Sequence, residues 1–173
     1  LDAALEEAFG KGIIANASIA QSEADRSVMW MAREQMSEVQ SKEGASIKHD
    51  ITVPIGAVPQ LIAAGVAAAA GVVPGIRPCP FGNLGDGNIH FNFSRPGGAD
   101  PKAFMAREKD VNAALYEVVG RLGGSISAEH GIGQLKSELL KQVKDPVALE
   151  MMRAIKQALD PKNILNPGKI FSA

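Results

Sequence analysis

One short segment, Asn88–Ser94 with the sequence NIHFNFS, constrains the fold of this chain more than any other. Polar and apolar residues alternate strictly along it, and this period of two is that of a β-strand with one buried face. The apolar face would carry Ile89, Phe91 and Phe93, and the polar face Asn88, His90 and Asn92. A solvated strand face usually carries Lys, Glu or Thr. We therefore predict that this polar face meets something other than water.

The composition is that of an ordinary globular domain. Of the 173 residues, 46% are hydrophobic and 21% are charged, and the formal net charge is −1. This charge gives no reason to expect nucleic acid or an anionic membrane as a partner. The single cysteine, Cys79, excludes an internal disulfide framework and fits a reducing compartment. The most apolar run, 61–73, has about 13 residues, whereas a membrane-spanning helix needs roughly 20. Because the chain starts at Leu1 within a helical pattern, we expect a piece of a longer polypeptide; the alternative is a start produced by processing.

The order of the predicted elements indicates an α+β fold. A short N-terminal helix and a long helix precede a strand, a helix, two strands, a second helix and a fourth strand, and further helices and an ordered tail follow. Strand-helix-strand-strand-helix-strand is the ferredoxin-like βαββαβ unit, an antiparallel sheet with both helices on one face. The predicted ranges are 22–42, 46–54, 59–71, 73–81, 88–94, 101–122, 125–129 and, for the last helix, 146–159.

The other face of such a sheet is free of helices, and the alternation assigns residues to it. The strands would place on this free face Lys48, Asp50, Thr52, Asn88, His90, Asn92, Ser125, Ser127 and Glu129. The apolar residues between them would face the two helices. For the last helix, we expect Met151, Met152, Ile155 and Leu159 to form the buried face.

Two of the three histidines lie in glycine-flanked motifs, GDGNIH and AEHGIG. His90, Glu129 and His130 are the residue types that bind a borderline divalent metal. A neutral histidine is also a suitable base for a hydroxyl proton near neutral pH. The alternative is that these are hydrogen-bonded polar residues beside loops.

Two further features suit the binding of an anionic, planar ligand. The loop GNLGDG joins two strands and has the pattern of neither a P-loop nor a dinucleotide fingerprint, so its glycines would permit positive φ and a close approach. The alternative is a plain hairpin turn. Arg33 and Ser37 are four residues apart on one helix face, and Lys48 could add a second positive charge for a carboxylate. The alternative for Arg33 is a solvated side chain.

Three motifs in order, GNLGDGNIHFN, SAEHGIGQLK and LDPKNILNPGKIF, resemble the C-terminal domain of FAD-linked D-2-hydroxyacid dehydrogenases. These enzymes belong to the vanillyl-alcohol oxidase superfamily and include D-lactate dehydrogenases, the glycolate oxidase flavin subunit and D-2-hydroxyglutarate dehydrogenase. SIKHDITVP is similar to the lysine-bearing strand of the last branch. The resemblance implies that residues 1–173 are a substrate-binding, flavin-capping domain, and that the N-terminal FAD-binding domain is absent from this chain.

The resemblance also implies roles for individual residues. A base, His130, would take the hydroxyl proton of the substrate while the C2 hydride goes to the flavin. The substrate would be held by Arg33, Ser37, Lys48, Asn92 and His130, with Ser37 standing where a Thr is common. Contacts to FAD are expected from Gly85, Asp86, Gly87, Asn88, Glu129 and Asn166.

The expected metal site departs from the family pattern. His90 and Glu129 match two of three ligands for a zinc-like ion, but Asn83 stands where relatives have a third ligand, a histidine. An amide oxygen is a harder and weaker donor than imidazole. We therefore expect reduced zinc affinity, a different divalent ion or no metal at all.

Several partners follow from the resemblance alone. They are a small 2-hydroxy acid, the FAD domain of the same polypeptide, and an electron acceptor such as a quinone, an electron-transfer flavoprotein or a cytochrome. We expect a homodimer, a cytoplasmic or membrane-peripheral location, and no activity from the fragment alone. Two alternatives remain open, a stand-alone ferredoxin-like ligand-binding or assembly module and a small metal-dependent hydrolase.

Overall fold

The computed structural model describes residues 1–83 and 85–171, except for the side chain of Ser37. The chain forms two compact units, Leu1–Lys42 and Glu43–Ala173. The α+β class predicted above is confirmed: among the described residues, an antiparallel sheet lies in the second unit, and both units contain helices.

The first unit is helical. Its helices are α1 (Asp2–Gly10), α2 (Glu23–Glu34) and α3 (Met36–Lys42). The helix predicted over 22–42 is therefore two helices separated by a turn at Gln35. The start of α2 follows ordinary capping chemistry, because Ser22 Oγ accepts a hydrogen bond from the backbone N–H of Asp25 at 3.1 Å.

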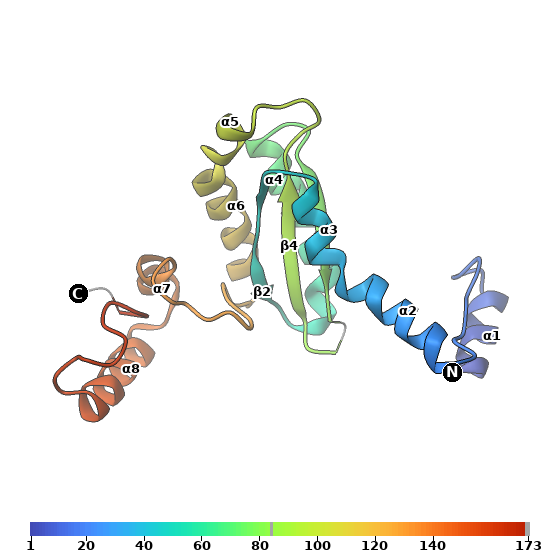
Figure 1. Cartoon of the computed structure of the whole chain (residues 1–173). Helices are drawn as coiled ribbons and strands as arrows, with labels where there is room; N and C mark the ends of the chain where they lie inside the picture. The colour runs from blue at the N-terminus through green and yellow to red at the C-terminus, as the bar shows by residue number, and fades with distance from the viewer. Residues whose placement is uncertain (84, 172–173) are drawn as a thin grey trace. The chain divides into compact units, whose positions relative to one another are not determined.

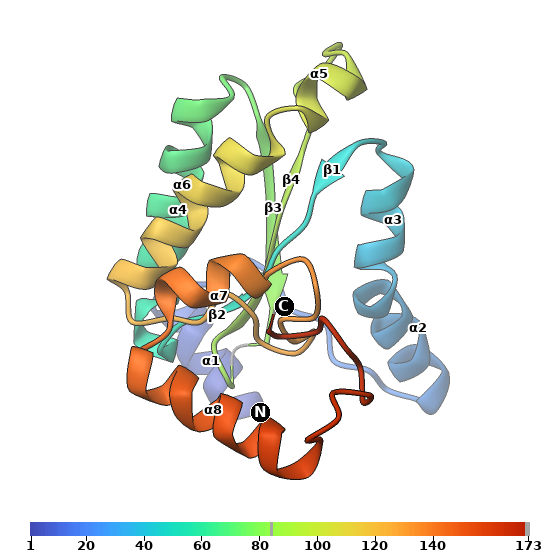
Figure 2. The same cartoon turned by 90° about the vertical axis from the view of Figure 1, so that its left-hand side faces the viewer.

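The sheet of the second unit is built around the alternating segment. The strand β4 (Asn88–Ser94) has the predicted bounds and lies between β3 (Arg77–Gly82) on one side and β1 (Ser46–Ile47) and β2 (Asp50–Thr52) on the other (Figure 2). All pairs are antiparallel. Pro78 and Pro80 lie on β3, which pairs with β4 alone among the described strands, and an edge strand tolerates proline because it needs fewer N–H donors.

The strand predicted over 46–54 is interrupted at Lys48–His49, although β1 and β2 keep the same register against β4. The cause is competition by side chains. The His49 N–H donates to Asn92 Oδ1 at 3.1 Å, and the ring Nδ1 of His49 lies 2.8 Å from Phe91 O, the acceptor that a regular ladder would use. One ladder bond survives here, from Phe91 N to His49 O at 3.0 Å.

The predicted fourth strand at 125–129 is wrong. Only Ser125 forms a bridge, to Thr52, with backbone hydrogen bonds of 2.8 and 3.2 Å. Beyond it, the N–H groups of Ala128, Glu129 and His130 bind a carboxylate, that of Asp50, instead of a neighbouring strand. The ladder therefore stops after one residue.

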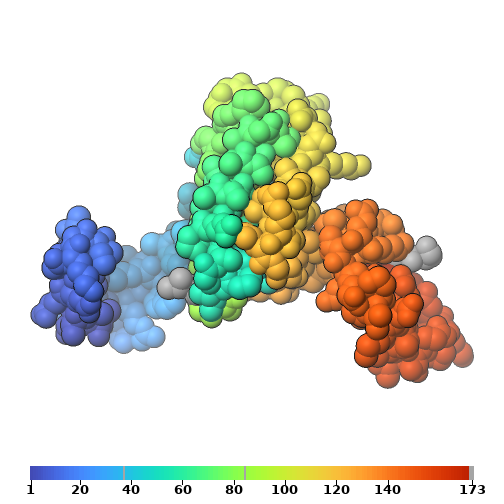
Figure 3. All heavy atoms as spheres, turned by 180° about the vertical axis from the view of Figure 1, so that it is seen from behind, coloured from blue at the N-terminus to red at the C-terminus, as the bar shows by residue number. Residues whose placement is uncertain are grey.

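Two helices cover one face of the sheet. The short 3-10 helix η1 (Ile55–Ala57) leads into α4 (Val58–Val72), and α5 (Pro101–Met105) precedes α6 (Glu108–Arg121), so the helix predicted over 101–122 is split. The helices α4 and α6 pack together on the same side of β3 and β4 (Figures 1 and 2). The space-filling view shows them side by side, α4 in green and α6 in yellow to orange (Figure 3).

The core lies between these helices and the sheet, as the alternation predicts. It contains the apolar face of the strands together with one stripe of each helix: Ile47, Ile51, Ile89, Phe91, Phe93, Leu61, Ala69, Val111, Leu115 and Val118. Among the described residues, one helical stretch, Ile55–Val72, is long and apolar enough to cross a membrane by length and composition. This stretch is longer than the apolar run 61–73 of the sequence because η1 and the first turn of α4 precede Leu61. Here Leu61, Gly65 and Ala69 are buried in the core.

The chain ends with α7 (Ser137–Val143), α8 (Pro146–Leu159) and an irregular tail. As predicted, Asp145 caps α8, and its Oδ1 accepts from Ala148 N at 3.0 Å. The predicted buried face of α8 is wrong at three of its four residues: Met151, Ile155 and Leu159 are 62%, 59% and 76% exposed, whereas Met152 is half-buried. Ile155 and Leu159 line a hollow together with Leu165, Ile170 and Phe171 of the tail, so the tail covers this face only in part. Periodicity correctly identified an apolar face but not what packs against it.

Candidate functional site

The structure brings His90 and His130 together on the sheet face that is turned away from α4 and α6. His90 lies on β4 between Ile89 and Phe91, which face the core, so the alternation directs its side chain to the opposite face. Its ring centroid lies 5.7 Å from that of His130 and 5.2 Å from that of Phe81, the residue opposite it on β3. Two motifs about 40 residues apart in the sequence thus meet at one place.

Asp50 belongs to the same group, although the motifs alone do not single it out. It is the direct cross-strand partner of His90, and it is only 3% exposed. One ligand atom from each of Asp50, His90 and His130 lies within 4.8 Å of the others. Burial raises the pKa of Asp50, but the N–H donors of His130 and Glu129 and the electrostatic interaction with His130 lower it, and the net shift is downward. Asp50 is therefore a buried, ionised carboxylate.

This group could hold a divalent cation. Two imidazoles and a carboxylate form a donor set that suits zinc and similar ions. Asp50 Oδ1 is buried and has no hydrogen-bond partner within the described part of the chain, so one oxygen remains for a ligand. The residues present thus fit a metal, but through Asp50 and both histidines.

The two other expected ligands have different surroundings. The Glu129 side chain is exposed and is not part of the group of three, although its backbone N–H donates to Asp50 at 2.9 Å. Asn83 lies just after β3, is exposed, and donates its backbone N–H to Asn88 O at 3.0 Å. Metal ligation by Glu129 and Asn83 therefore stays a prediction.

Two asparagines of β4 lie on the same face as His90, and both are buried. Asn92, an expected substrate contact, accepts the His49 N–H through Oδ1, which fixes the orientation of its amide. Asn88, an expected FAD contact, has neither amide atom paired with a described residue. A buried amide without partners offers one acceptor and two donors to a ligand or to water.

The tip of the β3–β4 hairpin is held close to the end of β2. Gly87 has φ +71°, and a Cβ there would lie 2.0 Å from Val53 O, so only glycine fits. Asp86 Oδ1 accepts the Asn88 N–H at 2.9 Å, which closes the turn. At Gly85 a Cβ would meet nothing within 4 Å, so its backbone is open to a large ligand. These three residues were expected to contact FAD.

The residues expected to bind the substrate carboxylates are distributed over both units. Lys48 is exposed and lies at the interruption between β1 and β2, on the second unit. Arg33 is on α2 of the first unit, where it lines a hollow of about 400 Å³ with Trp30 and Met29. The side chain of Ser37 on α3 lies outside the described residues.

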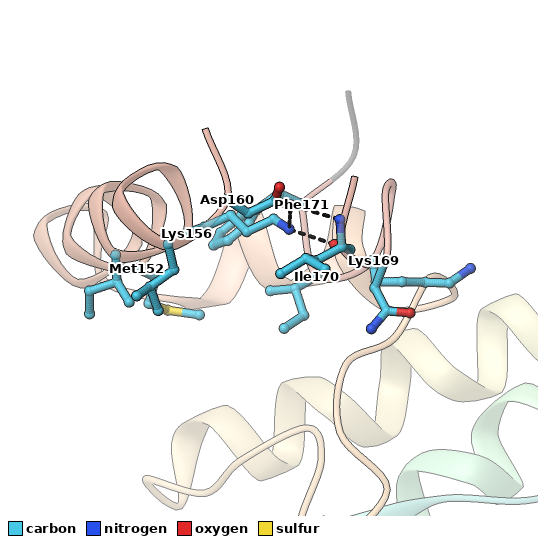
Figure 4. A pocket seen from close by; sticks show the side chains of 10 residues that line it. Met152, Lys156, Asp160, Lys169, Ile170 and Phe171 are labelled. Atoms are coloured by element: carbon cyan, nitrogen blue, oxygen red, sulfur yellow. Dashed lines mark hydrogen bonds and ion pairs between the residues drawn. The ribbon is translucent and has the colours of Figure 1, made fainter. Parts of the chain in front are cut away.

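The expected FAD contact Asn166 lies in the C-terminal tail. It has φ +47° and lines a mostly apolar hollow of about 460 Å³ between α8 and the tail (Figure 4). Lys156 and Asp160, which also line the hollow, form an ion pair. Asp160 also accepts the N–H groups of Ile164 and Leu165 at 2.9 Å, so the buried carboxylate fixes the course of the tail.

His49, the third histidine, was not expected to contribute. It is buried on the helix side of the sheet, its Nε2 lies 2.7 Å from Asn112 Oδ1, and its ring contacts Phe93 and Tyr116. Burial lowers its pKa. The alternation of 46–54 could have identified it, because His49 shares the parity of Ile47 and Ile51.

Comparison with known proteins identifies relatives of this chain and its family. The chain is 36% identical to a D-2-hydroxyglutarate dehydrogenase of Stutzerimonas stutzeri (strain A1501), and the match covers 99% of this chain and 37% of the relative. The mitochondrial D-2-hydroxyglutarate dehydrogenase of Bos taurus is 33% identical over 96% of this chain, and that of Arabidopsis thaliana is 33% identical over 99%; each match covers 29% of the relative. The chain thus spans roughly a third of the length of these relatives. Residues 1–170 match the profile of the family described as FAD linked oxidases, C-terminal domain, and the chain belongs to this family.

Proposed function

We propose that this domain binds the substrate and supplies the base of an FAD-dependent dehydrogenase that oxidises a D-2-hydroxy acid to the 2-oxo acid. The observation that carries the proposal is the grouping of His90, His130 and Asp50 on the sheet face free of α4 and α6. Membership of the FAD-linked oxidase family supports a flavin as the partner of this face. The D-2-hydroxyglutarate dehydrogenases among the relatives favour D-2-hydroxyglutarate as the substrate.

His130 is the proposed base. Its side chain is 67% exposed, so a substrate can reach it, while its backbone is held by Asp50. In the reaction, His130 accepts the proton of the C2 hydroxyl as the C2–H bond breaks and the carbonyl forms. FAD supplies the hydride acceptor, and the products are the 2-oxo acid and the reduced flavin. The same imidazole then releases its proton to water.

Charged and amide side chains would hold the substrate. Lys48 and Arg33 each offer a positive charge, and two cations suit a substrate with two carboxylates better than D-lactate or glycolate. Ser37 and Asn92 would add hydrogen bonds. A cation bound by Asp50 and His90 would polarise the substrate oxygen while the ring of His130 stays free to take the proton.

A flavin-binding domain is the proposed cover of the exposed surfaces of this chain. The apolar side chains of α8 and the hollow beside the tail would pack against it (Figure 4). The hairpin tip with Gly85, Asp86, Gly87 and Asn88, together with Glu129 and Asn166, would contact FAD. A quinone, electron-transfer flavoprotein or cytochrome as electron acceptor, a homodimer, and a cytoplasmic or membrane-peripheral location complete the proposal.

We also propose that the sheet has ferredoxin-like topology. The order of the bridging residue Ser125, β2, β4 and β3 across the sheet supports it, together with α4 and α6 on one face. The fourth strand of that topology is reduced here to a single bridge.

The test is a substrate screen on a polypeptide that carries this domain together with its flavin-binding part, with an artificial dye as acceptor. We expect D-2-hydroxyglutarate to be oxidised with a higher kcat/KM than D-lactate or glycolate. His130→Ala should slow flavin reduction by about 100- to 10 000-fold, the range of general-base catalysis. Arg121→Ala, which removes an exposed charge from α6, is the control.

Two results would contradict the proposal. Flavin that is reduced by none of these hydroxy acids would refute the reaction. Flavin that is reduced at the wild-type rate in His130→Ala would refute the base.

A further inference from the structure

Three successive backbone N–H groups converge on a single oxygen of Asp50. The donors are Ala128, Glu129 and His130, at 3.1, 2.9 and 2.8 Å from Oδ2. Ser127 Oγ lies 3.4 Å from the same atom. Consecutive N–H groups that point into one concavity form a nest, which is an anion-binding arrangement of the backbone. Here the anion is a side chain of the protein itself.

The two halves of this arrangement differ in how they are held. Asp50 is fixed by the sheet, because it lies on β2 and pairs directly with His90 on β4. Residues 126–136 belong to no helix or strand. Apart from the nest, few hydrogen bonds join this segment to the other described residues of the unit. They include Ile170 N to Gly133 O at 2.7 Å, Lys169 Nζ to Gln134 Oε1 at 3.0 Å and Ser137 Oγ to Gln134 O at 2.9 Å. Within the segment, Lys136 Nζ donates to Ile126 O at 2.7 Å.

We propose that Asp50 is a positioning residue for the reaction. Its carboxylate binds the backbone that carries His130 and thereby fixes the position of the His130 ring relative to His90. The proposal rests on the proposed function, in which His130 is the base. Asp50 acts on the backbone and not on the ring: Asp50 Oδ2 lies 3.9 Å from His130 Nδ1, beyond hydrogen-bond distance.

The charge of Asp50 matters as well as its shape. Hydrogen bonds to an ionised acceptor are roughly twice as strong as neutral ones, and the nest directs three of them at one atom. An asparagine would keep the size of the side chain and one carbonyl oxygen but would lose the charge. The proposal therefore predicts that Asp50→Asn loosens the segment 127–130 while β2 and β4 keep their pairing.

The first experiment measures amide hydrogen exchange by NMR on the 173-residue chain without metal. In the wild type, the amides of Ala128, Glu129 and His130 should be protected to a degree approaching those of β2, although they lie in a loop. Asp50→Asn should speed their exchange by about tenfold or more and alter the ring proton shifts of both His90 and His130. Because the wild-type measurement needs no variant, the proposal stays testable if Asp50→Asn does not fold.

The matched control is Asp160→Asn, which neutralises another buried carboxylate that accepts two backbone N–H groups, in the C-terminal tail. It should leave the amides of 128–130 and both histidine rings unchanged. Unprotected amides at 128–130 in the wild type, or unchanged exchange and ring shifts in Asp50→Asn, would overturn the proposal. Equal effects of the two variants on these amides would also overturn it, since they would indicate general destabilisation.

A second experiment connects positioning with catalysis. In the flavin-containing polypeptide, Asp50→Asn should lower kcat by about tenfold to a hundredfold with a much smaller change in KM, because the base is displaced while Lys48 and Arg33 remain. An unchanged kcat in an active enzyme would contradict the role of Asp50. If the wild-type polypeptide oxidises no 2-hydroxy acid, the proposed function fails, whereas the exchange data still decide what Asp50 holds.

Discussion

A methyl group added at Gly65 provides a sensitive test of the packing that supports the site. Gly65 lies on α4 and is buried against β4 and α6. A Cβ at this position would lie 2.9 and 3.0 Å from two ring carbons of Phe91 and 3.0 Å from Leu115 Cδ1. Carbon atoms in contact prefer about 3.5–4.0 Å, so each of these distances is too short by roughly half an ångström.

Two opposing effects determine the result of Gly65→Ala. Overpacking of a well-packed core costs about 1–3 kcal/mol. Alanine in a helix interior is favoured over glycine by about 0.8–1.0 kcal/mol. The free energy of unfolding should therefore fall by about 0–2 kcal/mol. Gly71→Ala on the same helix is the matched control, because a Cβ there meets nothing within 4 Å, and it should raise stability by about 0.5–1 kcal/mol.

The assay should report on the second unit alone. Trp30, the single tryptophan, lies in the first unit, so its fluorescence would not follow the sheet. Hydrogen exchange of the amides of Phe91 and Phe93 in the core strand is suitable, because core amides exchange through global unfolding. The informative quantity is the difference between the two variants, expected at about 1–3 kcal/mol. If Gly65→Ala stabilises the chain as much as Gly71→Ala, the close approach of α4 to Phe91 is wrong.

Three further predictions concern charge and metal binding. Burial lowers the pKa of His49 below its ordinary value, so on acidification the unfolded chain binds a proton at His49 before the folded chain does, and the free energy of unfolding should fall as the pH drops below about 6.5. Urea unfolding between pH 7.5 and pH 5.5 measures this pH dependence. A pH dependence that is equally steep in His49→Gln would contradict the prediction. The hydrogen bond from Lys156 lowers the pKa of Asp160, so the stabilisation of the tail by the Asp160 carboxylate is present above about pH 4 and is lost as the pH falls through the folded-state pKa. The Leu165 amide should therefore lose its protection from hydrogen exchange in acid. A Leu165 amide that stays protected after Asp160 is protonated would disprove the role of this carboxylate in holding the tail. Asn83→His should raise zinc affinity by at least about tenfold, because imidazole is a better zinc ligand than an amide oxygen. Competition with a chromophoric chelator measures this affinity. An unchanged affinity would mean that residue 83 does not contribute to zinc binding.

Periodicity worked where one face of an element packs within this unit. The bounds of β4 and the core residues Ile89, Phe91 and Phe93 follow from the alternation alone, because burial of one face permits only one register. The same reasoning failed for α8, where the apolar face of Met151, Ile155 and Leu159 is exposed. A hydrophobic pattern indicates that a face is to be covered, but it does not identify the cover.

The sequence by itself determined the family, the two histidine motifs and the polar face on which His90 lies, because motif identity and strand parity are local properties. Only the tertiary structure decided that Asp50 is the third member of the group and that the chain leaves the sheet after Ser125. Both depend on which acceptor the N–H groups of 128–130 find, and that acceptor lies about 80 residues earlier in the chain. Such a choice between a neighbouring strand and a buried carboxylate is made by three-dimensional proximity, which no local pattern encodes.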